Sequence, residues 1–200
     1  MAKPNQPFLT EVTPLLIEAA AAFQRRGSDR PPATAVTRAL LDAERTTRQH
    51  HLTFPLESLR GDWRLCFVVS RRSARQQNGA PIGTGWYVPP LGVAQISFTP
   101  TELSSGAGTI ANQVRIGSLV FQLTGPIRYS GQKNLLAFDF TEATLALLGR
   151  SVYRGNIGKE KRFADQPIGK LPFFAFFLVT TEVIAARGRG GGLALWVRNS

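Results

Sequence analysis

Two stretches near the N-terminus have the hydrophobic spacing of α-helices. Between about residues 13 and 26 the apolar side chains recur every three or four positions, which places them on one helical face: Leu16, Ile17, Ala20 and Phe23. Thr13-Pro14 suits the start of this helix and Arg25-Arg26-Gly27 its end. A second helix is predicted from about 33 to 50, with an apolar stripe of Val36, Leu40 and Leu41. The two stretches predict a helical hairpin.

From Leu59 onward the apolar residues recur with a period of two, which is typical of β-strands. Glycine and proline separate the alternating segments. About six to nine antiparallel strands of this kind indicate a barrel or sandwich. We therefore expect an α+β protein, with an N-terminal helical segment over residues 1–55 and an antiparallel β-barrel domain over residues 56–200.

Composition adds a strong positive charge to this fold. The 200 residues are 43% hydrophobic, enough for a core, and 24 Lys+Arg against 13 Asp+Glu give a net charge of +11. Residues 1–55 carry a net charge of +2, from seven basic and five acidic groups, and residues 56–200 carry +9, from seventeen and eight. An anionic partner is therefore expected, and it should contact the β domain.

Several classes of protein are excluded by what the chain lacks. The single cysteine, Cys66, cannot form an internal disulfide, so a reducing compartment is expected. Residues 1–10 contain no apolar run that suits a secretory signal. The longest aromatic and apolar run, Phe173 to Val179, is seven residues long, against the roughly 20 that span a bilayer. We expect no transmembrane segment, and any membrane contact should be peripheral.

The first and last predicted strands contain residues suited to closing a barrel. Gly61 precedes Trp63 by two positions, which allows a tight turn while the indole plugs one end. Arg198 at the end of the last strand would place its guanidinium over that indole. This arrangement occurs in calycin barrels, the lipocalin-like class.

Four segments resemble the plastid lipid-associated proteins, also called fibrillins, of plastids and cyanobacteria. The first segment is Leu59-Arg60-Gly61-Asp62-Trp63-Arg64-Leu65, and the others are residues 108–114, Phe138-Asp139-Phe140 and the terminal stretch 181–198 with its Arg-Gly turn and final apolar strand. The chain departs from the family pattern at Cys66-Phe67-Val68-Val69, where a Tyr-Thr pair is usual, and at Thr181-Glu182, where an acidic pair is usual.

The resemblance implies a lipocalin-like barrel that binds a small apolar molecule, such as a carotenoid, quinone, tocopherol or other isoprenoid lipid. It also implies a location in the cytoplasm at the thylakoid membrane of a cyanobacterium, or in a plastid for a processed form. It supplies no catalytic residues. A barrel of about eight strands holds one small ligand between its inward side chains. The candidate inward, ligand-binding residues are Phe67, Val69, Phe98, Val114, Ile116, Phe121, Phe138, Phe140 and Leu195.

Two surface regions are predicted to contact an anionic membrane or an acidic photosynthetic protein. Phe173 and Phe174 lie in the most hydrophobic stretch, and the preceding loop would place cations beside them: Arg154, Lys159, Lys161 and Arg162. Arg187 and Arg189 lie in a glycine-rich turn, where they would meet phosphate head groups. Arginine-glycine tracts also occur in RNA-binding tails, but this one is single and lies between two strands, so we expect no nucleic-acid partner.

No catalytic or metal site is predicted. The chain has no Gly-x-Ser-x-Gly, P-loop or His-Glu-x-x-His motif, and the adjacent His50 and His51 would point apart. A non-catalytic lipid-binding protein is therefore expected, with two alternatives: a lyase that attaches bilins to phycobiliproteins, and a scaffold factor that docks an acidic photosynthetic complex. Inward phenylalanines fit both a hollow barrel and a filled one.

Overall fold

The computed structural model describes residues 9, 11–77, 80–158 and 163–199. Its two α-helices, α1 (Thr13–Gln24) and α2 (Ala33–Gln49), pack against each other as a hairpin. Helix α1 already includes Thr13, whose hydroxyl donates to the Leu9 carbonyl at 2.7 Å. Within the described residues, no helix is long and apolar enough to cross a membrane.

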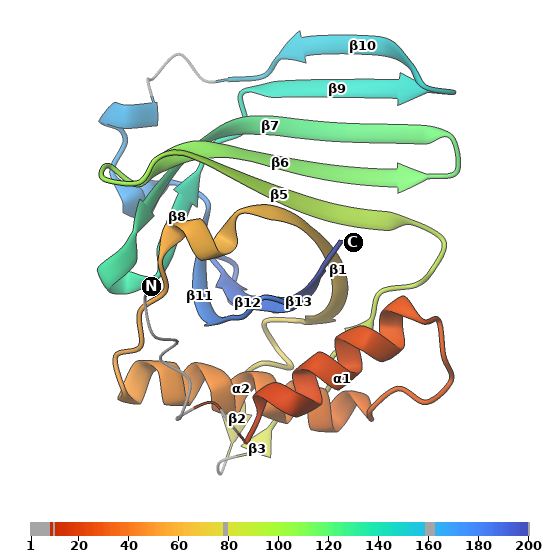
Figure 1. The fold of residues 1–200 in the computed structure, drawn as a ribbon, viewed down its shortest axis with the longest axis vertical. Helices are drawn as coiled ribbons and strands as arrows, with labels where there is room; N and C mark the ends of the chain where they lie inside the picture. The colour runs from red at the N-terminus through yellow and green to blue at the C-terminus, as the bar shows by residue number, and fades with distance from the viewer. Residues whose placement is uncertain (1–8, 10, 78–79, 159–162, 200) are drawn as a thin grey trace.

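Eight antiparallel strands close into a barrel beside this hairpin (Figure 1). The closure is made by β13, which pairs with β1 on one side and with β12 on the other. In order around the barrel the strands are β1 (Gly61–Val69), β5 (Val93–Glu102), β6 (Ala107–Ile116), β7 (Leu119–Ser130), β8 (Leu135–Phe138), β11 (Phe173–Val179), β12 (Val183–Gly188) and β13 (Leu193–Arg198). The predicted α+β fold, helices followed by an antiparallel barrel, is confirmed.

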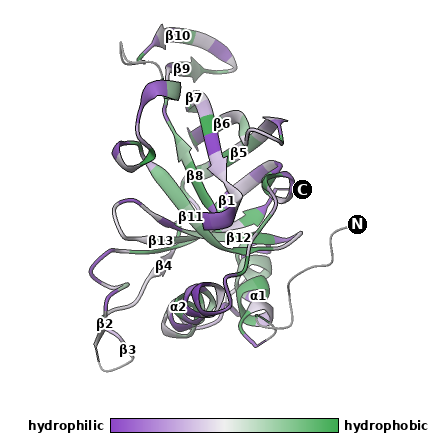
Figure 2. Ribbon diagram, turned by 90° about the vertical axis from the view of Figure 1, so that its left-hand side faces the viewer, coloured by the Kyte–Doolittle hydropathy of each residue, from purple (hydrophilic) through white to green (hydrophobic). Residues whose placement is uncertain are grey.

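Strand β7 belongs to the barrel and also to a sheet that extends beyond it. Its residues 127–130 pair with β8 in the barrel, whereas residues 119–124 pair with β9 (Glu142–Leu147). Strand β10 (Arg150–Asn156) then pairs with β9. Together with the adjoining ends of β5 and β6, these strands form a sheet extension, and Figure 2 shows β9 and β10 at the end of the molecule farthest from the helices.

Gly125 lies where β7 exchanges one partner strand for the other. A Cβ atom at this position would lie 1.8 Å from the Asp139 carbonyl oxygen, so only glycine lets the link between β8 and β9 pass this close. Two backbone hydrogen bonds hold the link on either side: the Asp139 amide donates to Pro126 (3.2 Å) and the Thr141 amide to Thr124 (2.9 Å).

The remaining elements are short connections. Strands β2 (Gln76–Gln77) and β3 (Ala80–Pro81) pair with each other, and β4 (Trp86–Tyr87) pairs with β1. Single 3₁₀ turns occur at Leu56–Leu59, Gly131–Lys133, Phe163–Asp165 and Ile168–Lys170.

The helical hairpin packs against the outer wall of the barrel. Helix α1 contacts β12 and β13, and α2 contacts β11. The Thr47 hydroxyl donates to the Phe177 carbonyl at 2.6 Å, and Arg187 forms an ion pair with Glu44 across the same interface. One buried cluster therefore runs from the helices through the wall into the barrel interior.

Candidate functional site

One end of the barrel is closed by Trp63 and Arg198. The Arg198 guanidinium lies 4.1 Å from the centroid of the Trp63 ring, and its Nε and Nη1 donate to the carbonyls of Thr181 (2.6 Å) and Arg60 (3.1 Å). Gly61 has a φ of +116°, and a Cβ there would lie 2.7 Å from Arg198 Nη1. The three residues predicted to close the barrel are thus in contact, and the candidate site lies at the other end.

A β-bulge at Cys66 changes the face to which the second half of β1 points. Trp63 pairs with Arg198 and points into the barrel, and pairing after the bulge resumes between Phe67 and Leu195. Leu195 is three residues from Arg198 on a regular strand, so the two side chains lie on opposite faces. One extra residue in a strand inverts the alternation that follows it, so Phe67 and Val69 point to the outside of the wall and Val68 points to the inside.

The expectation that Phe67, Val69 and Leu195 point inward is corrected by this bulge. All three are buried, but in the core between the barrel wall and the helices. The Phe67 ring packs edge-on against Tyr87 at 5.0 Å, beside Gly85, whose amide donates to Thr37 of α2. These residues stabilise the packing of the hairpin and are not exposed to a ligand.

The barrel interior is packed with aromatic rings. Phe98 and Phe176, from opposite walls, are in edge contact at 5.9 Å between centroids. Phe138 stacks on Phe174 at 5.1 Å, and Phe174 is in edge contact with Trp196 at 5.6 Å. Phe98 and Phe138 do point inward, as predicted, but they contact other rings. Of the two possibilities left open by the sequence, a hollow barrel and a filled one, this part of the barrel is filled.

At the end opposite Trp63 the inner face continues onto the sheet extension and is uncovered there. Phe140, half-buried, lies 5.2 Å from Phe138 at this open end. Beyond it, direct cross-strand pairing aligns Val114, Phe121, Leu145 and Tyr153 in one row over β6, β7, β9 and β10. Val114, Phe121 and Tyr153 are 39%, 42% and 53% exposed. We call this row, with the neighbouring Leu123, the apolar shelf.

The opposite face of the same four strands is polar. The adjacent cross-strand row contains Gln113, Gln122, Thr144 and Arg154, and Arg154 forms an ion pair with Glu142 there at 2.5 Å. The side-chain hydrogen bond from Arg154 lowers the pKa of the Glu142 carboxyl. The extension is therefore amphipathic. Its polar face is suited to water, whereas none of the described residues covers the apolar shelf on the other face.

Turns at the open end also carry arginine and lysine. We define the basic rim as Arg71 and Arg72 in the turn after β1, Arg189 between β12 and β13, and Lys170 before β11. Arg189 Nη1 donates to the Lys170 carbonyl at 2.6 Å, and the Arg71 side chain lies beside Gly191. All four side chains are exposed. The closed end carries both signs of charge: Glu57, which is paired with Arg60, and Asp62, Glu102 and Glu182, together with Lys133 and Arg198.

The residues predicted to contact a membrane or acidic partner are separated in the structure. Phe174 lies among the rings of the barrel interior, and Phe173 beside it is half-buried. Arg187 is paired with Glu44, whereas Arg189 belongs to the basic rim. Arg154 lies on the polar face of the extension. Lys159, Lys161 and Arg162 lie outside the described residues. The described members of this set do not share one surface.

The period-two pattern of the sequence is sufficient to predict Leu123 and Leu145 as residues of the apolar shelf, but it does not predict Tyr153. Leu123 and Leu145 share the period of Phe121 and Leu147 in their own strands. A bulge at Val152 shifts the phase of β10, so that Tyr153 faces the shelf where regular alternation would place Val152.

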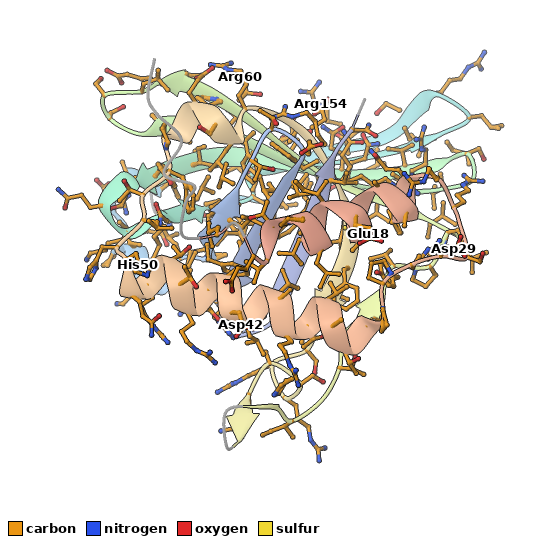
Figure 3. All side chains as sticks on the ribbon, turned by 60° about the horizontal axis from the view of Figure 1, so that its bottom comes forward. Glu18, Asp29, Asp42, His50, Arg60 and Arg154 are labelled. Carbon is orange, nitrogen blue, oxygen red and sulfur yellow. The ribbon has the colours of Figure 1, made fainter. Side chains whose placement is uncertain are left out.

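Potentially reactive groups are few. Burial raises the pKa of the Cys66 thiol, which removes the thiolate that a nucleophile needs. His50 lies at the C-terminal end of α2 (Figure 3). The described part of the chain contains no group of three or more His, Cys, Asp or Glu residues that could hold a metal ion. The site offers apolar contact and positive charge.

Comparison with known proteins found no relative: no family model matches the chain, and no curated protein matches it.

Proposed function

We propose that this is a non-catalytic, lipid-associated protein with a lipocalin-like barrel. It binds an isoprenoid-type apolar molecule, such as a carotenoid or quinone, on the apolar shelf, and it works at an anionic membrane surface, for which the thylakoid is the candidate. The proposal differs from ordinary carriage by a lipocalin, because the ligand lies beside the barrel opening and not within the barrel.

The uncovered apolar shelf is the observation that carries this proposal. The three most exposed side chains of the row leave roughly 250 Å² of surface in water, so that covering them contributes about 6 kcal/mol before the entropic cost of binding. A long, flat isoprenoid chain fits a row of side chains that crosses four strands. Phe140, half-buried at the open end, adds a ring against which a quinone or polyene would pack.

The basic rim supports the membrane part of the proposal. It lies on the turns before β11, between β12 and β13 and after β1, at the same end of the barrel from which the shelf extends. Cations near an anionic surface each contribute about 1 kcal/mol to association. A lipid passing between a membrane and the shelf would therefore move along a short path.

Equilibrium dialysis against a short-chain prenyl benzoquinone tests the ligand proposal without membranes. We expect a dissociation constant on the order of micromolar. Phe121→Ser should weaken binding roughly ten-fold, since it removes the central contact of the row. Leu103→Ser is the matched control, because Leu103 is 58% exposed on the turn after β5 at the closed end. Equal binding by wild type and Phe121→Ser, or no binding by wild type, contradicts the proposal.

A further inference from the structure

Three neighbouring turns at the far edge of the sheet extension carry exposed aliphatic residues. Ile116 and Leu119 flank the turn between β6 and β7, and Leu147 and Leu148 belong to the turn between β9 and β10. Leu91 precedes Gly92, whose Cβ position lies 3.5 Å from the Ile116 side chain. Leu91, Leu148 and Ile116 are 85%, 77% and 60% exposed. We call these five residues the apolar tip.

The apolar tip is one surface and not a set of separate loops. Leu119 pairs directly with Leu147, and the Leu148 amide donates to the Ser118 carbonyl at 3.1 Å. Figure 1 shows the two turns side by side at the right of the view. The contact holds the aliphatic residues at a common level.

Leu148 adopts a backbone conformation that leucine rarely takes. Its φ is +51° and that of Gly149 is +77°, and together they form a two-residue hairpin turn. Turns with positive φ at both positions strongly favour Asn-Gly or Asp-Gly. A leucine here strains the backbone, and because its side chain is exposed to water, packing against the described residues does little to compensate for that strain. Strained backbone of this kind clusters at functional positions such as ligand-binding and switch segments, so it favours a functional role for Leu148.

Arginines flank the apolar tip on both faces of the sheet. Arg150 pairs with Leu147 and therefore shares the face of the apolar shelf, whereas Arg115 precedes Ile116 and lies on the polar face. Both side chains are exposed. A bilayer surrounds an edge that inserts into it, so anionic headgroups would meet both faces of the sheet. An apolar tip with an arginine on each face is suited to that environment. A protein partner would more naturally match one face of the sheet.

We propose that the apolar tip inserts into an anionic lipid bilayer, with Arg115 and Arg150 at the level of the phosphate groups, and that this edge anchors the protein. The inference rests on the lipid-associated function proposed above, because it places the protein at a membrane. It adds the anchoring element and its orientation: the strands of the extension enter by their turns, and the apolar shelf stands directly above the lipid surface.

Co-flotation with vesicles of phosphatidylglycerol and phosphatidylcholine tests the anchor. Leu148→Asn removes the aliphatic side chain and supplies the residue that the turn prefers, so this variant should melt at a higher temperature and bind anionic vesicles about ten-fold more weakly. Leu103→Asn, at the closed end, should bind like wild type. Arg115→Gln and Arg150→Gln should each lose roughly five-fold on anionic vesicles and almost nothing on pure phosphatidylcholine.

Insertion itself is measured with a label at position 148. Because Cys66 is fully buried, a Leu148→Cys variant can be labelled at the turn alone with an environment-sensitive fluorophore, whose emission should shift to the blue on anionic vesicles. Wild-type binding by Leu148→Asn, an unshifted emission, or binding to a membrane protein without binding to vesicles each overturns the anchor. Quinone dialysis separates the two proposals. If wild type and Leu148→Asn bind the quinone equally well but wild type does not bind vesicles, the anchor is refuted and the ligand proposal stands.

Discussion

Removal of the Arg198 guanidinium should open the closed end of the barrel. Arg198→Met keeps an unbranched side chain of similar length but removes the charge over Trp63 and the donors to the carbonyls of Thr181 and Arg60. A partly desolvated cation–π contact contributes about 1–2 kcal/mol, and each hydrogen bond about 1 kcal/mol net. Because the two carbonyls can regain water, we expect a total loss of about 2–3 kcal/mol, or roughly 8 °C in melting temperature.

Urea unfolding followed by tryptophan fluorescence and circular dichroism measures this loss. Arg198→Lys should lose about half as much, since lysine keeps the charge but cannot bridge two carbonyls with a planar fork. A double-mutant cycle with Trp63→Leu should give a coupling of about 1 kcal/mol. Arg154→Met is the control, because its ion pair with Glu142 is exposed and should not change the unfolding midpoint. A loss below about 0.5 kcal/mol in Arg198→Met, or no coupling to Trp63, refutes the closure argument.

Three further predictions concern the rest of the barrel. Gly125→Ala should cost about 3 kcal/mol or more by thermal unfolding, because its Cβ would meet backbone on the β8–β9 link, whereas Gly169→Ala, with open space around it, should not; equal melting temperatures would disprove the close approach. Burial raises the pKa of Tyr87 to about 12, so the folded state retains a proton that the unfolded chain loses near pH 10. Stability should therefore fall as pH rises from about 10 to 12, less steeply in Tyr87→Phe, and a parallel titration of both proteins would remove Tyr87 as the cause. Cys66 should react with a thiol reagent only at the rate of unfolding, and fast labelling of the native protein would contradict its burial.

The sequence was sufficient for the elements and for the closed end. Both helices have apolar faces that the spacing predicts, and the strands follow a period of two that only β-structure satisfies. Gly61, Trp63 and Arg198 could be placed together because their roles depend on residue type: a positive φ, a large flat ring and a planar cation. Roles that depend on residue type in this way can be predicted from the sequence alone.

The side of the wall to which each residue points was less predictable, because bulges are not visible in a hydrophobic pattern. One extra residue at Cys66 moves Phe67 out of the barrel, and one at Val152 moves Tyr153 onto the shelf. Gly125-Pro126 indicates a break between two strands, but β7 continues through it and exchanges partners there, and this exchange carries Val114 and Phe121 beyond the barrel. The same period-two pattern therefore occurs in residues that are packed inside the barrel and in residues that are exposed on the extension. Only the pairing of the strands in the folded structure distinguishes the two groups.

The position of β13 between β1 and β12 has a consequence for how the chain folds. Strand β1 is made early, but its pairing along the closing seam requires residues 193–198, so a nascent chain has an incomplete barrel until those residues have left the ribosome. Pairing of strands so distant in sequence is slow, because the entropy of a long loop is lost before any contact forms. Meanwhile the unpaired edge and the apolar wall under the helices remain open to other chains. Barrel closure therefore follows the release of residues 193–198 from the ribosome, and a chaperone that shields the open edge would act before that step.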